Sequence, residues 1–220
     1  MNFEWKEEWL PLLAIVGTFA VSILFYPQLP DTIPTHWNAA GQPDSYSPRL
    51  VGAFLMPVIM LGVYLLLLFL PRIDPRRTNI ERFSETYTLL RIGMTLFFAY
   101  IHGVILYTVL SNQETLTTGL IFGGVGVLLM LIGNHMPRMR SNWFMGIRTP
   151  WTLSSDSVWQ KTHRLGGKLF MLAGFLILLA PFFDPSWTFW VMMVAIVLSG
   201  IVPIIYSYFL YQQEQGPSQA

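Results

Sequence analysis

The sequence predicts an all-α, polytopic membrane protein with six transmembrane helices and both termini in the cytoplasm. Hydrophobic residues make up 53% of the 220-residue chain and charged residues only 11%, and the mean hydropathy is +0.50. A soluble domain carries about 25% charged residues. Six apolar segments reach or approach the ~20 residues that a spanning helix needs. The basic residues gather between alternate segments, which indicates how the chain is oriented.

The six expected spans cover residues 10–26, 50–70, 92–110, 116–133, 169–183 and 187–211. The fifth is short, so we expect its helix to begin before Leu169, with Lys168 reaching back to the interface. Pro203 predicts a kink in the sixth span. The N-terminal MNFEWKEEW carries three glutamates and lacks a convincing cleavage site downstream, so we expect the first span to be retained rather than cleaved as a signal peptide.

The distribution of lysine and arginine orients these spans. Segments 71–91 and 134–168 together hold 11 of the 13 basic residues, and Lys6 lies on the same side. Only Arg49 lies on the other side. Because basic loops stay in the cytoplasm, both termini are predicted to be cytoplasmic.

This topology divides the chain into four parts. We expect a two-span unit with an outward polar loop at 27–49, then a cytoplasmic connection with the third span, a three-span unit with a cytoplasmic loop at 134–168, and a disordered polar tail. Their bounds are 1–70, 71–111, 112–211 and 212–220.

The outward loop is rich in proline and turn residues. Five prolines argue against a helix through it, and Asn38, Gly41 and Asp44 favour turns. His36 and Asp44 are placed to share a proton or a metal ion, but two ligands are too few for a zinc site. Two interpretations stay open: a compact loop in which His36 is hydrogen-bonded locally, or a surface that contacts a ligand.

The third span carries two titratable residues. Thr78 to Glu81 fits a capping box and predicts a helix start near Asn79. Arg91 and His102 are eleven residues apart, which places them on one helical stripe. They form either a polar track or ligand site inside the bundle, or an interfacial arginine and a histidine satisfied by a backbone or tyrosine partner.

Gly119 and Gly123 in the fourth span form a GxxxG pattern. This pattern is typical of a face where two helices approach closely. We expect it to pack against another helix of the same chain.

The longest polar interval is 142–168, with four basic residues and three tryptophans. Gly146 permits a turn, Thr149-Pro150 interrupts any helix, and Ser154 or Ser155 is placed to cap a new one. Tryptophan is common at the headgroup level, so Trp151 and Trp159 are expected to be interfacial anchors. Arg148 is expected to be solvated or to contact a headgroup, and the basic residues favour anionic lipid.

No catalytic or cofactor-binding motif occurs in the chain. However, NWFMGIRTPWTLSSDSVWQKTHRLGGK at 142–168 resembles the signature of the SdpI immunity family. PTHWNAAGQPDSYSPR at 34–49 looks like the N-terminal domain of unknown function that accompanies it, and IDPRRTNIERF at 73–83 matches the connection between them. The resemblance covers nearly the whole chain.

The resemblance implies a bacterial plasma-membrane protein that confers immunity to a secreted, cannibalism-type peptide toxin, with no enzymatic activity and no cofactor. The founding member also holds an autorepressor at the membrane when toxin is present. On this basis we expect a toxin outside, and a repressor and anionic lipid headgroups inside, as partners. The toxin-facing residues would be His36, Asn38, Gly41 and Asp44. The cytoplasmic site would comprise Asn142, Gly146, Arg148, Thr149, Trp151, Thr152, Trp159 and His163.

Two other functions stay open from the sequence. One is a transporter or membrane-embedded enzyme with a polar cavity lined by Arg91, His102, Asn134, His135 and Arg148. The other is a structural membrane protein without a ligand.

Overall fold

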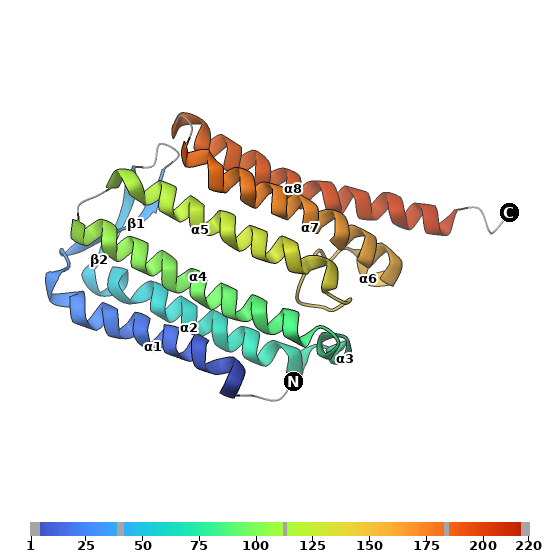
Figure 1. Ribbon diagram of the computed structural model, residues 1–220, viewed down its shortest axis with the longest axis horizontal. Coiled ribbons are helices and arrows are strands. Elements are labelled where there is room, and N and C mark those ends of the chain that lie inside the picture. Colours follow the sequence, from blue (N-terminus) through green and yellow to red (C-terminus); the bar gives the residue numbers. More distant parts are fainter. Residues whose placement is uncertain (1–4, 39–41, 112–113, 183–184, 217–220) are drawn as a thin grey trace.

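The computed structural model describes residues 5–38, 42–111, 114–182 and 185–216, and Figure 1 shows an elongated helical bundle with a small hairpin at one end. Within these ranges, six helices are long and apolar enough to cross a membrane, as predicted. The elements in chain order are α1 (Trp5–Phe25), η1 (Tyr26–Gln28), β1 (Thr32–Trp37), β2 (Pro43–Pro48), α2 (Arg49–Ile73), α3 (Arg77–Glu81), α4 (Ser84–Ser111), α5 (Glu114–His135), η2 (Met136–Arg138), α6 (Pro150–Ser154), α7 (Asp156–Leu179), η3 (Ala180–Phe182) and α8 (Pro185–Gln215).

The six long helices form two three-helix units. Helices α1, α2 and α4 pack together around Ile15, Met60 and Tyr64, while α5, α7 and α8 pack around Ala173 and Ile177. The units meet where α4 runs beside α5, and we call this contact the seam (Figure 1).

Glycines bring α5 and α7 into close contact. A Cβ added at Gly126 would lie 2.7 Å from the carbonyl oxygen of Gly174, and one added at Gly133 would lie 2.7 Å from that of Gly167. Contacts are looser at Gly119 and Gly123, where an added Cβ would lie 3.5 Å from Pro181 of η3 and 4.0 Å from Leu178 of α7. The expected packing within the chain is therefore confirmed, but its tightest point lies beyond the GxxxG pattern.

The proline-rich loop contains an antiparallel β-hairpin that the sequence analysis did not predict. Strand β1 pairs with β2 in a register that places Ile33 opposite Ser47 and Pro34 opposite Tyr46. Prolines fit here because a two-stranded ribbon has only edge strands, where missing donors do not break a ladder. Ile33 is buried against Gly52 of α2, which fixes the hairpin to the bundle.

Two predicted helix starts and the predicted kink at Pro203 can be compared with the structure. The third span was expected to begin near Asn79, and this is wrong: α3 is a separate short helix without a side-chain cap, and α4 starts at Ser84. The amide of Phe83 bonds the carbonyl of Ile80 in the turn between them. The fifth spanning helix does begin early, at Asp156, with Ser155 as its cap. Pro203 lies inside the continuous helix α8.

Candidate functional site

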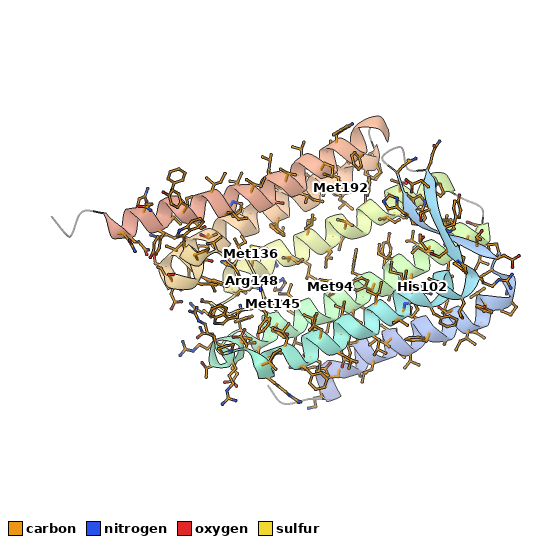
Figure 2. The ribbon with its side chains drawn as sticks, turned by 180° about the vertical axis from the view of Figure 1, so that it is seen from behind. Met94, His102, Met136, Met145, Arg148 and Met192 are labelled. Carbon is orange, nitrogen blue, oxygen red and sulfur yellow. The ribbon has the colours of Figure 1, made fainter. Side chains whose placement is uncertain are left out.

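The segment that carries the GIRTPWTL sequence folds into a compact structure at one end of the bundle. We call residues 139–155 the basic-end loop, because the neighbouring segments hold most of the basic residues. It lies beside the start of α7 and the α2–α3 connection. Figure 2 shows Met145 and Arg148 at this end, far from His102. Its side chains have two kinds of environment, one buried and one exposed.

Asn142 organises the first turn of the loop. Its Oδ1 accepts hydrogen bonds from the amides of Phe144 (3.0 Å) and Met145 (2.7 Å), and its Nδ2 donates to the carbonyl of Arg140 (2.9 Å). The side chain is fully buried. Because all its hydrogen-bonding groups serve the local backbone, Asn142 shapes the loop rather than facing a ligand.

Gly146 and His163 fit together in the next turn. Gly146 has φ +98°, a conformation that favours glycine, and a Cβ there would overlap Nε2 of His163. That nitrogen accepts from the amide of Ile147 (3.0 Å), while Nδ1 bonds the carbonyl of Trp159 (2.8 Å). The two bonds require a neutral imidazole with its proton on Nδ1.

Trp159 lies beneath this histidine. The two rings stack with centroids 4.0 Å apart, and the indole Nε1 donates to the carbonyl of Met139 (2.9 Å). Trp159 is only 1% exposed. The expectation that it anchors the protein at the interface is therefore wrong. The ring is packed in the protein interior, where its one hydrogen-bond donor is satisfied by a carbonyl.

Thr149 and Thr152 form a reciprocal capping box at the start of α6. The Thr149 hydroxyl also bonds that of Ser207 on α8 (3.1 Å), and Thr152 donates to the carbonyl of Ile147 (2.9 Å). Thr149-Pro150 thus begins a helix, since proline suits the first helical position. Trp151 packs edge-on against Tyr208, with ring centroids 5.1 Å apart.

The α2–α3 connection holds the basic-end loop from the other three-helix unit. Arg76 donates to the Ser141 hydroxyl and to the carbonyl of Leu153 (3.0 Å), and Asp74 accepts from the amide of Trp143 (3.0 Å). These contacts were not predicted from the sequence, because Arg76 and Asp74 are more than 60 positions away from their partners in the loop. The only signal was the match of IDPRRTN to the family connection.

Arg148 and Trp143 lie on the exposed side of the loop. Trp143 is 47% exposed, and its carbonyl accepts from Arg148 (2.6 Å). The expectation of a solvated Arg148 agrees with this position. Among the eight residues predicted for the cytoplasmic site, Arg148 combines an exposed position with a charged side chain that a partner could contact.

Arg91 lies inside the first three-helix unit. It pairs with Glu8 of α1, whose other oxygen accepts from Tyr64 of α2 (2.8 Å). Arg91 is therefore held inside the protein by an ion pair and is not exposed to lipid headgroups. Glu8 was overlooked because it was counted only as a terminal charge, although a buried arginine requires a counter-ion.

His102 lies further along the same interface. Its Nε2 is 2.8 Å from the Ser22 hydroxyl, which donates to the carbonyl of Ala53 (2.8 Å). The partner is a serine rather than the expected backbone group or tyrosine. Nδ1 of His102 and Nε of Arg91 are buried without a protein partner.

The five residues of the proposed polar cavity lie in separate environments. Arg91 and His102 are enclosed by α1, α2 and α4, and His135 bonds the carbonyl of Leu131 (2.9 Å). Asn134 and Arg148 are exposed near the basic end. These described residues thus have separate partners, so the geometry gives no support to that alternative.

The hairpin presents an exposed histidine–aspartate pair at the opposite end of the molecule. His36 Nδ1 lies 2.5 Å from Asp44 Oδ1, which confirms the local hydrogen bond, and Asn38 Oδ1 accepts from the amide of Gln42 (3.0 Å). Gly41 lies outside the described residues. Across the part of the chain that is described, no group of three or more His, Cys, Asp or Glu side chains is placed to hold a metal ion.

Comparison with known proteins gives matches in both three-helix units. Residues 138–207 match the SdpI/YfhL protein family, and residues 13–61 match a domain of unknown function, DUF1648. The chain is 28% identical to the immunity protein SdpI of Bacillus subtilis (strain 168) over 96% of its own length and 99% of the relative's.

Two shorter similarities accompany this match. An uncharacterized membrane protein of the same organism, YbgB, is 40% identical over 21% of this chain and 52% of its own length. An uncharacterized protein of Archaeoglobus fulgidus is 31% identical over 36% of this chain and 42% of its own. No solved structure gives a significant match.

Proposed function

The chain belongs to the SdpI/YfhL family, and from this premise we propose that it is a membrane immunity protein that protects its cell against a secreted peptide toxin. The observation that carries the proposal is the similarity to the Bacillus subtilis immunity protein, which extends through both three-helix units and the loops between them. The six helices that are long and apolar enough to cross a membrane would place the protein at the cell boundary, where a secreted toxin acts.

In this proposal the hairpin end is the first surface that the toxin meets. All basic residues except Arg49 belong to segments at the other end of the bundle, which the positive-inside rule assigns to the cytoplasm. The hairpin carries exposed polar and aromatic side chains, including His36, Asp44 and Tyr46. Its fixed position on α2 makes it a preorganised surface for contact.

Five residues of the family sequence have a scaffolding role in this proposal. Asn142, Gly146, Thr149, Thr152 and His163 are used by the loop itself. They hold the exposed side of the basic-end loop, with Arg148 and Trp143, in one conformation. This is the surface we assign to a cytoplasmic repressor, should the protein also signal the presence of toxin.

Toxin challenge tests the immunity proposal directly. Cells that are sensitive to a purified cannibalism-type peptide toxin would express this chain, and its membrane level would be measured in the same cultures. We expect survival to rise relative to cells with an empty vector. Unchanged killing at a confirmed membrane level would contradict the proposal.

The signalling role is tested separately. Detergent-solubilised protein from toxin-treated cells would be captured and its bound soluble proteins identified, with the Arg148→Glu variant as the control. Recovery of a DNA-binding repressor with the native protein but not with the variant would support this role. Equal recovery with both would remove Arg148 from the contact, and no recovery would limit the function to protection.

A further inference from the structure

An apolar groove runs along the seam between the two three-helix units. It has a volume of about 650 Å³ and is lined by α4, α5 and Leu178 of α7. Leu89, Leu96 and Tyr100 line it from α4, and Val127 and Leu131 line it from α5. Several of these side chains are substantially exposed, so the groove opens sideways toward the membrane.

We propose that this groove holds an acyl chain of a phospholipid whose phosphate lies at the basic end of the bundle. The proposal concerns the native membrane environment of the protein and is independent of the immunity function.

The length of the groove fits one leaflet of a bilayer. Its lining on α4 runs from Leu89 to Tyr100, which is eleven steps along the helix, or about 16 Å at 1.5 Å per step. The hydrocarbon core of a bilayer is ~30 Å thick, so one leaflet contributes about half of that. A spanning peptide helix needs the whole thickness and would extend well past this groove.

Tyr100 closes the groove toward the hairpin end. Its hydroxyl donates to the carbonyl of Leu120 on α5 (2.9 Å), so the side chain bridges the seam. The ring lies over Gly124, where a Cβ would come within 2.6 Å of it. A chain occupying the groove must therefore enter from the side or from the basic end.

The charges at the open end suit a phosphate. Helix α4 starts and α5 ends there, in segments 71–91 and 134–168, which contain ten basic residues besides the buried Arg91, and four acidic ones. Glu85 lies one turn before Leu89 on the same face of α4 and would repel a phosphate, but basic residues outnumber acidic ones in these two segments. Basic residues near the surface attract lipid phosphate by about 1 kcal/mol each.

Binding is measured with purified, delipidated protein in detergent by native mass spectrometry. A palmitoyl-oleoyl phosphatidylglycerol or phosphatidylethanolamine is added, and the matching diacylglycerol, which lacks the phosphate, serves as the comparison. We expect one phospholipid to remain bound per chain, with at least tenfold less adduct for diacylglycerol. Equal retention of diacylglycerol, or no retained phospholipid, would overturn the proposal.

Two matched variants locate the site. Val127 lines the groove and is 57% exposed, whereas Val58 on α2 is 56% exposed and does not line it. Val127→Trp places an indole in the groove and is expected to reduce the bound phospholipid at least tenfold, while Val58→Trp leaves it unchanged. Equal binding by both variants would show that the lipid lies elsewhere.

A measurement on the unaltered protein covers the case in which Val127→Trp does not fold. A phospholipid with a photoreactive diazirine in its acyl chain is cross-linked to the wild-type protein, and the labelled peptides are sequenced. Labels concentrated in 89–100 and 123–131 support the proposal. Labels spread over the lipid-facing side of α8, or bound detergent alone, would contradict it.

Discussion

Arg91 of α4 forms an ion pair with Glu8 of α1 in the interior of the first three-helix unit, and each side chain is 2% exposed. Tyr64 of α2 donates to the second oxygen of the same carboxylate. One carboxylate thus joins all three helices of the unit. An ion pair so deep in an apolar bundle makes each partner dependent on the other.

Replacement of either partner should therefore destabilise the protein strongly. We expect Arg91→Leu or Glu8→Leu to lower stability by about 3–5 kcal/mol, because each leaves a buried charge without its partner. The double variant should recover much of this loss. Thermal unfolding in detergent measures the effect, with exposed Arg82→Leu as the control. Additive losses in the double variant would show that the pair is not coupled.

The glycine–histidine fit in the basic-end loop gives a second test. Gly146→Ala should destabilise the loop by about 1–3 kcal/mol, since it combines a positive φ with an overlap onto the His163 ring. Gly146→Ala with His163→Ala should cost less than the sum of the two single changes, because the smaller side chain removes the overlap. Unfolding of the three variants and the native protein measures this difference.

Local sequence patterns predicted much of the fold but few of the partners. Hydropathy located the six spans, and Ser155 was predicted as a candidate helix cap, because both depend on neighbouring residues. The bonds from Arg76 to Ser141 and from Arg91 to Glu8 join residues 65 and 83 positions apart. No local pattern encodes such pairs.

The tryptophans show the same limit within the site. Trp143 and Trp159 occur in one polar segment and have the same expected preference for the interface. The structure leaves Trp143 exposed and buries Trp159 under His163. What separates them is the fold of the loop, in which Met139 supplies the carbonyl that Trp159 needs.

Substitutions at Asn142 and Arg148 should have different effects, because we assign Asn142 to the scaffold of the loop and Arg148 to its contact surface. Asn142→Asp keeps the acceptor for two amides but loses the bond to the Arg140 carbonyl and buries a charge, so we expect a marked fall in melting temperature. Arg148→Ala should leave it nearly unchanged, because the side chain is exposed. Melting temperatures and toxin survival are measured together. A strongly destabilised Arg148→Ala protein would contradict its assignment to the contact surface.

The hairpin pair is expected to affect function more than stability. His36 and Asp44 are 67% and 43% exposed, and exposed pairs contribute about 0–1 kcal/mol. Asp44→Ala should therefore fold normally and reduce survival under toxin if the hairpin is the first contact. Asp31→Ala, which removes an exposed partner of Arg49 at the same end, is the matched control. Full survival of the Asp44→Ala cells would exclude this carboxylate from the contact.

The orientation of the bundle underlies these assignments, and the absence of cysteine makes it directly testable. Ser45 lies exposed on β2, and Ser154 lies exposed at the end of α6, at opposite ends of the molecule. In intact cells a membrane-impermeant maleimide should label Ser45→Cys but not Ser154→Cys, because the positive-inside rule predicts that the basic end is cytoplasmic. After the membrane is permeabilised, both should react. Labelling of only Ser154→Cys in intact cells would invert the topology and place the basic-end loop, rather than the hairpin, in contact with an external toxin.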